Sequence, residues 1–195
     1  VGDVEMVTIT SRDPGPPPYG YIERSGGIFR DMTIHDFDVA RWLLEEEIES
    51  VFASGSVLVD SGIGERGDFD SVNVILKTSS GRQAVITNSR RAAYGYDQRI
   101  EVHGSAGAIS AQNQHEARIE LADADGYHRP PLLNFFMDRY TAAYAAEIAA
   151  FAHAVETGSQ PPTTGDDGLL ALVLAEAAVR STAEARAVNV AEIIG

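Results

Sequence analysis

The order of the predicted elements is the feature that most constrains the fold, because strands follow strands and the long helices come after them. Runs with alternating apolar and β-branched residues occur at about 48–59, 70–78, 83–92 and 98–104. Only Ser79-Ser80-Gly81-Arg82 separates the second run from the third, which suits a hairpin turn and is too short for a crossover helix. Two Ala-rich segments with helical periodicity, 138–157 and 166–185, occupy the last third. This grouping predicts an α+β domain with an open, mostly antiparallel sheet and helices packed on one face.

Shorter elements complete the predicted fold. Residues 5–12 alternate as a strand does, and the Pro- and Gly-rich residues 13–20 are predicted to form a loop. Residues 31–44 have the pattern of an amphipathic helix, with Trp42 on the apolar side together with Phe37. The remaining short strands are expected near 108–111, 116–122 and 187–190.

The composition limits the classes of partner and compartment. The 195 residues carry a formal net charge of −14, which repels nucleic acid and anionic membrane surfaces, so we expect neither as a partner. Cysteine is absent, which removes disulfides and thiolate metal sites and fits a cytoplasmic location. We expect residues 1–195 to form a single domain. The sequence starts without an initiator Met, so we expect it to be a fragment of a longer polypeptide.

Asp31 and His35 are the strongest candidates for chemistry. In a helix, a spacing of four places both side chains on one face, about one turn apart. An imidazole can take or give a proton near neutral pH, and a nearby carboxylate can fix its tautomer. The plainer alternative is that Asp31 caps the helix and His35 packs against the sheet. For an isolated Asp-x-x-x-His pair, this alternative is the more common case.

Other candidates are weaker. Tyr94 and Tyr96 flank Gly95, and two phenol hydroxyls can bind and stack on a polyhydroxylated ring or can simply pack within a turn. Asp13, at the end of the first strand, can face either a pocket or solvent. Of the neighbours Arg90 and Arg91, one is expected to face solvent, because adjacent strand residues point in opposite directions. We expect no metal site, since four further histidines lack ligand spacing: His103, His115, His128 and His153.

Several strings in the chain together resemble one family. They are GGIFRDMTIHDFDVARWLL at 26–44, SRDP at 11–14, YGYDQR at 94–99 and GDDGLLAL at 165–172. In this order they resemble the glucose-fructose oxidoreductase, inositol dehydrogenase and rhizopine-catabolism family (Gfo/Idh/MocA), and within it the inositol 2-dehydrogenases. The resemblance covers about residues 4–193.

The resemblance implies a fold and a division of labour. Members have an N-terminal Rossmann domain that binds NAD or NADP. Their C-terminal α+β domain, like that of glyceraldehyde-3-phosphate dehydrogenase, supplies most of the substrate site and the oligomer contacts. The present sequence resembles the second domain only, and it contains neither a Gly-x-Gly-x-x-Gly nor a Glu-Lys-Pro motif. We therefore expect most cofactor-binding residues to lie in the Rossmann domain, and we expect residues 1–195 alone to be inactive.

The resemblance also implies residue roles. His35 would be the acid/base that takes the hydroxyl proton during oxidation of a ring alcohol to a ketone, with Asp31 as its partner. Asp13 and one of Tyr94 and Tyr96 would contact the substrate, which is inositol or a related polyol or sugar. The open sheet implies a homodimer or homotetramer. The competing hypothesis is a non-catalytic dimerisation or ligand-binding module of the same fold.

Overall fold

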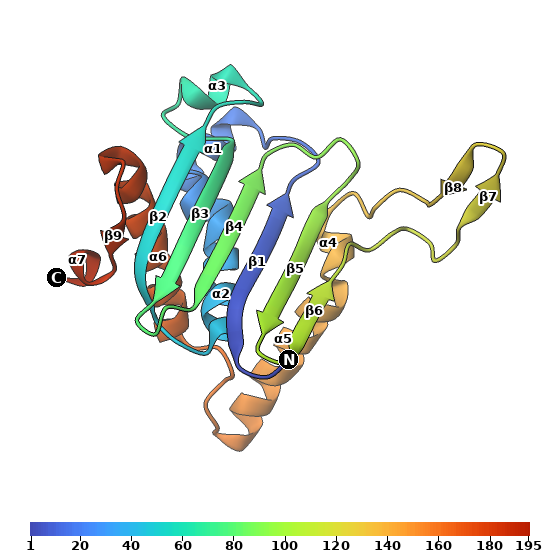
Figure 1. Ribbon diagram of the computed structural model, residues 1–195. Helices are drawn as coiled ribbons and strands as arrows, with labels where there is room; N and C mark the ends of the chain where they lie inside the picture. Colours follow the sequence, from blue (N-terminus) through green and yellow to red (C-terminus); the bar gives the residue numbers. More distant parts are fainter.

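The centre of the molecule is a seven-stranded mixed sheet, seen in a computed structural model that describes all of residues 1–195 (Figure 1). The strands lie in the order β6-β5-β1-β4-β3-β2-β9. Their bounds are Val4–Arg12 for β1, Ile48–Ser56 for β2, Ser71–Thr78 for β3, Gln83–Ser89 for β4, Asp97–Gly104 for β5, Gly107–Ala111 for β6 and Val188–Asn189 for β9. Only β1 and β4 are parallel neighbours, so the prediction of a mostly antiparallel sheet is confirmed.

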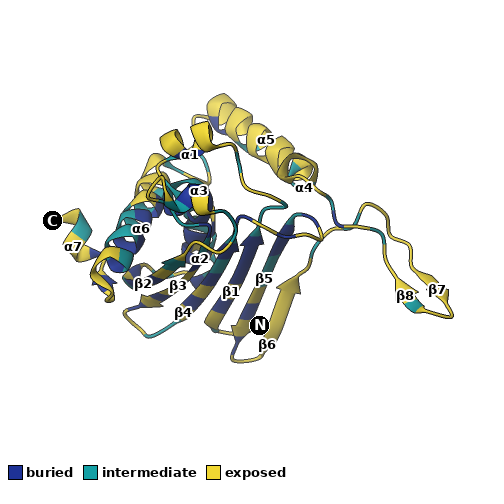
Figure 2. Ribbon diagram, turned by 90° about the horizontal axis from the view of Figure 1, so that it is seen from above, coloured by how far each residue is buried: buried dark blue, intermediate teal, exposed yellow.

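The helices lie on one side of this sheet and leave the other side uncovered (Figure 2). A π-helical turn, Phe29–Thr33, leads directly into α2, and α2 and α6 pack against the strands and against each other. The helices are α1 (Tyr19–Ser25), α2 (Ile34–Leu44), α3 (Ser61–Gly64), α4 (Phe136–Arg139), α5 (Thr141–Thr157), α6 (Gly165–Glu184) and α7 (Ala191–Ile194). The predicted one-sided packing is confirmed.

The core lies between the sheet and these helices. Val72, Val74 and Leu76 of β3 are buried, whereas Asn73, Ile75 and Lys77 are exposed, as a period of two requires when one face is covered. Phe37 of α2 and Leu174 of α6 pack into the same cluster. This cluster fixes the start of α2 over the centre of the sheet.

Four local predictions were wrong in part. Trp42 is 74% exposed and does not join the core. The predicted helix at 31–44 begins with the π-helical turn, and the predicted helix at 138–157 is interrupted at Tyr140, between α4 and α5. The predicted loop 13–20 ends early, because the carbonyl of Pro18 accepts hydrogen bonds from the amides of Tyr21 and Ile22 and so starts α1.

The strand expected near 116–122 is mostly absent. Only β7 (Leu121–Asp123) forms there, and it pairs with β8 (Gly126–His128) in a small hairpin that projects from the body (Figure 1). Residues 116–120 belong to no strand, and an alternating pattern cannot form a ladder without a neighbouring strand.

Candidate functional site

The parallel pair β1 and β4 creates a polar edge, because the carboxyl ends of both strands lie at the same edge of the sheet. Asp13 follows β1 and Arg90 follows β4. The amide of Asp13 donates to the carbonyl of Ser89 at 3.0 Å, and the amide of Arg90 donates to the carbonyl of Asp70 at 2.8 Å. Both side chains therefore start from backbone that is held in place.

Arg90 links two carboxylates at this edge. Its Nη2 is 2.6 Å from Asp31 Oδ2, and its Nη1 is 3.3 Å from Asp13 Oδ2. The guanidinium side chain is only 4% exposed. The hydroxyl of Tyr21 donates to the other oxygen of Asp31. The π-helical turn that carries Asp31 is thus tied both to β4 and to α1.

Asp36 is a second, deeper carboxylate in the first turn of α2. It accepts hydrogen bonds from the hydroxyl of Ser11 at 2.8 Å and from the side-chain amide of Asn88 at 2.7 Å. The hydroxyl of Thr33 donates to the Asn88 carbonyl oxygen at 2.6 Å. Burial raises the pKa of Asp36 above its ordinary value, against the opposing effect of these hydrogen bonds. This network joins the start of α2 to β1 and β4.

His35 directly precedes Asp36 in the first turn of α2, and its side chain is exposed. A positive charge on the His35 imidazole would lower the pKa of the Asp36 carboxyl, because the two groups interact electrostatically. The backbone around His35 is fixed by the buried bonds of its neighbours Thr33 and Asp36. An accessible imidazole on a rigid support is the arrangement that proton transfer to a bound ligand requires.

The two candidate tyrosines lie in different surroundings. The Tyr94 hydroxyl donates to Asp97 Oδ2 at 2.6 Å and accepts from Arg12 at 3.0 Å, so its hydrogen bonds are already made within the protein. Tyr96 packs edge to face against Tyr140, with ring centroids 6.1 Å apart. Burial raises the pKa of the Tyr96 hydroxyl most, its interactions with Tyr140 raise it further, and the nearby charges of Asp13 and Asp36 add to the rise. Tyr96 therefore stays a protonated hydrogen-bond donor.

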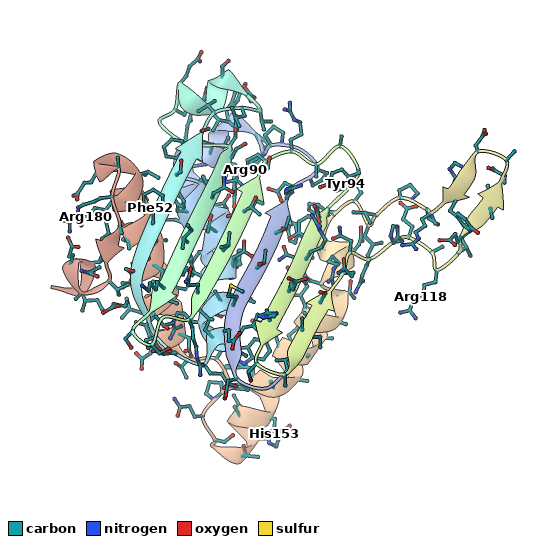
Figure 3. The ribbon with its side chains drawn as sticks, viewed as in Figure 1. Phe52, Arg90, Tyr94, Arg118, His153 and Arg180 are labelled. Carbon is teal, nitrogen blue, oxygen red and sulfur yellow. The ribbon has the colours of Figure 1, made fainter.

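The turn between these tyrosines depends on Gly95. Its φ is +116°, a conformation that favours glycine, and a Cβ there would lie 2.8 Å from the Cβ of Leu132. Figure 3 shows Arg90 and Tyr94 at the same end of the sheet, whereas His153 lies at the opposite end of the molecule.

Comparison with known proteins shows the family to which a chain with this fold belongs. Residues 1–110, more than half of the chain, match the model described as the GFO/IDH/MocA C-terminal domain. The chain belongs to the GFO/IDH/MocA family. The resemblance drawn from the sequence strings is therefore confirmed.

Relatives of this family domain include inositol dehydrogenases. The chain is 64% identical, over 98% of its length, to the inositol 2-dehydrogenase of Rhizobium meliloti (strain 1021) and covers 58% of that protein. It is 51% identical over its whole length to the myo-inositol 2-dehydrogenase of Thermotoga maritima, again covering 58% of the relative. The chain thus spans less than two thirds of the length of these relatives.

Solved structures agree with these matches. A myo-inositol dehydrogenase from Corynebacterium glutamicum superposes with a TM-score of 0.94 at 43% identity, over 97% of this chain and 57% of that one. The scyllo-inositol dehydrogenase of Lactobacillus casei, solved with bound NAD(H) and scyllo-inositol, superposes with a TM-score of 0.88 at 27% identity, over 98% of this chain and 58% of that one.

Within this GFO/IDH/MocA domain, the structure shows which of the predicted site residues lie close together. Asp13 and Asp31 meet at Arg90, and Tyr96 faces the same region. Asp31, which was predicted to pair with His35, accepts hydrogen bonds from Arg90 and Tyr21, and His35 directly precedes the buried Asp36 in α2. The roles of His35 and Asp31 remain predictions.

Sequence reasoning missed three residues of this region: Tyr21, Asp36 and Tyr140. The Asp directly after His35 was present in the string HDFD, but its burial follows only from the side chains of β1 and β4. The expectation that one of two neighbouring arginines faces solvent is confirmed, because Arg90 is buried and Arg91 is exposed.

No group of three or more His, Asp or Glu side chains is arranged to hold a metal ion. No helix is both long and apolar enough to cross a membrane.

Proposed function

We propose that this chain is the substrate-binding domain of an inositol dehydrogenase, an enzyme that oxidises a ring secondary alcohol of inositol or a related polyol to a ketone. The observation that carries the proposal is the cluster at the carboxyl ends of β1 and β4, where Asp13, Asp31 and Tyr96 surround the start of α2 and His35 is exposed beside them. Carboxylate oxygens and a neutral phenol are suited to a neutral, polyhydroxylated ring. The relatives named inositol 2-dehydrogenase support this choice of substrate.

We do not expect the residues of this chain to supply the main part of the dinucleotide site. A pyrophosphate needs unpaired positive charge or a glycine-rich loop before a helix, whereas the buried cation of the cluster, Arg90, is already paired with two carboxylates. We therefore assign NAD or NADP binding to the part of the polypeptide that the matched relatives have beyond this region. The nicotinamide, when bound, supplies the acceptor for the hydride that leaves the alcohol carbon.

The residues of this chain handle the proton and the orientation of the ring. His35 takes the proton from the hydroxyl oxygen as the carbon–oxygen double bond forms, and it returns a proton to that oxygen in the reverse reaction. Asp13 and Asp31 accept hydrogen bonds from ring hydroxyls, and Tyr96 donates one. Fixing several hydroxyls at once selects which ring carbon is presented for oxidation.

The test is the dehydrogenase activity of the full-length gene product on myo-inositol, scyllo-inositol and glucose, with NAD and with NADP. We expect oxidation of an inositol, and we expect His35→Ala to lower kcat/KM by roughly 10²-fold or more, because a positioned base contributes at least that much. His153→Ala, at the far end of the molecule, is the matched control and should leave kcat/KM unchanged. Full activity of His35→Ala would contradict the assigned role, and binding without turnover would favour a non-catalytic module.

We also propose that the uncovered sheet face forms the contact between copies of the protein, in a homodimer or homotetramer. Thr8, Val85, Ile75 and Phe52 are aligned across β1, β4, β3 and β2 by the strand register. The last three of these are exposed although they are apolar. A row of apolar side chains on a flat sheet is suited to face-to-face packing against a second sheet.

A further inference from the structure

Arg90 is the cation at the centre of the site cluster, and its position is unusual for an arginine. Its side chain is 4% exposed, and its Nε, which is also buried, has no hydrogen-bond partner. An arginine is almost never fully buried unless it is paired, because removing its charge from water is costly. Here the compensation comes from Asp13 and Asp31, with Nη–Oδ distances of 3.3 and 2.6 Å.

The three residues come from separate parts of the fold. Arg90 follows β4, Asp13 follows β1, and Asp31 belongs to the π-helical turn before α2. Backbone hydrogen bonds fix the first two at their origin, from the Arg90 amide to Asp70 and from the Asp13 amide to Ser89. The guanidinium therefore sets the distance between the Asp13 and Asp31 carboxylates, because no single strand or helix carries both residues.

We infer that Arg90 is a positioning residue of the dehydrogenase site, which holds Asp13 and Asp31 at a fixed separation as two ionised acceptors for neighbouring hydroxyls of the ring. The inference rests on the proposed function and extends it to a residue that would not itself touch the substrate. A guanidinium is suited to this task, since its planar fork presents two donors in fixed directions.

The surroundings make the positive charge of Arg90 necessary. The pKa of Asp13 is raised overall: burial raises it most, the charge and hydrogen bond of Arg90 lower it, and the nearby charge of Asp31 raises it further. The phenols of Tyr21 and Tyr96 also lie near these carboxylates, and His35 and the buried Asp36 follow in the first turn of α2. Without Arg90, two carboxylates would share a partly buried space, and one of them would take up a proton and become a donor.

The neighbour Arg91 provides a matched control. It is also an arginine at the end of β4, but it is exposed, and its guanidinium donates only to the carbonyl of Leu58, at 3.4 Å. Three variants of the full-length enzyme separate charge from geometry: Arg90→Gln removes the charge, Arg90→Lys keeps the charge without the fork, and Arg91→Gln changes the control position.

The first measurement is kcat/KM for inositol as a function of pH. We expect Arg90→Gln to lower kcat/KM roughly 10- to 100-fold, since a small misplacement of positioning groups has that effect. Its acid limb should also move to higher pH, because a carboxylate that has lost its cation protonates more readily. Compared with Arg90→Gln, Arg90→Lys should bring the acid limb closer to its wild-type position, but it should recover less of the wild-type kcat/KM. Arg91→Gln should match the wild type. An Arg90→Gln enzyme with the wild-type rate and acid limb would overturn the inference.

The second measurement does not depend on activity. The side-chain carboxyl carbons of Asp13 and Asp31 are titrated by NMR in the full-length protein, and we expect the midpoint of at least one to rise in Arg90→Gln and to change less in Arg90→Lys. Unchanged midpoints in both variants would overturn the inference. If the wild-type enzyme oxidises no polyol, the proposed function fails on that result alone, and the titration still decides whether Arg90 keeps the two carboxylates ionised.

Discussion

At the scale of single residues, Asp36 is the most consequential buried group, because it ties the start of α2 to two strands. We expect Asp36→Ala to lower the free energy of unfolding by about 2–4 kcal/mol, since it leaves the Ser11 hydroxyl and the Asn88 amide unpaired in the core. Asp36→Asn should cost less, because the Ser11 hydroxyl can reverse its role and accept from the new amide. Urea unfolding of both variants and the wild type measures these differences.

Comparison of the wild type with Asp36→Asn also gives a prediction about how stability depends on pH. Because burial raises the pKa of Asp36 in the folded state, its contribution to stability is present below the unfolded pKa and is lost as pH rises through the folded value. Asparagine does not titrate. The stability of wild type relative to Asp36→Asn should therefore fall as pH rises above about 4, the ordinary pKa of an Asp side chain. A constant difference across this range would show that the carboxylate carries no burial penalty.

The residue scale also shows where prediction from sequence stops. Spacing alone placed Asp31 beside His35, because a four-residue separation brings side chains together in a regular α-helix. Asp31 lies in a π-helical turn, and its carboxylate accepts a hydrogen bond from Arg90, a residue 59 positions away that the spacing could not indicate. A local pattern identifies residues capable of chemistry, but their partners depend on strand order, which no local pattern contains.

At the scale of elements, the N-terminus of α6 is closed by a capping box. The hydroxyl of Thr164 accepts from the amide of Asp167, and the Asp167 carboxylate accepts from the amide of Thr164 at 2.8 Å. Thr164→Ala should lower the free energy of unfolding by about 1 kcal/mol, because a first-turn amide loses its acceptor. Thr163→Ala is the control, since that exposed neighbour makes no side-chain hydrogen bond. Equal unfolding midpoints for the two variants would contradict the cap's contribution.

Most elements could be predicted because their patterns are set by burial on one face. Alternation located β3 and β4, and acidic starts with helical periodicity located α6. The errors fall where the deciding interaction is not periodic. Trp42 fits the helical stripe but extends beyond the edge of the core, and the ladder of β7 is limited by the length of its partner β8.

At the scale of the whole molecule, the two faces of the sheet differ in what covers them. Helices cover one face (Figure 2). On the other face, the strand register aligns the exposed residues Val85, Ile75 and Phe52 in one row. Burying such a row between two copies removes apolar area from water on both sheets. The covered face builds the site cluster, and the uncovered face remains available for assembly.

This division leads to a prediction about assembly. Ile75→Lys places a charge at the middle of the row, so we expect the full-length protein to dissociate into smaller species, because an unpaired charge buried in a contact is costly. Size-exclusion chromatography with light scattering measures the mass of each species. Ile194→Lys in α7 is the control, since Ile194 is also an exposed isoleucine but lies outside the sheet row. An unchanged mass for Ile75→Lys would place the contact between copies elsewhere. Loss of mass in both variants would indicate general destabilisation, which urea unfolding would then reveal.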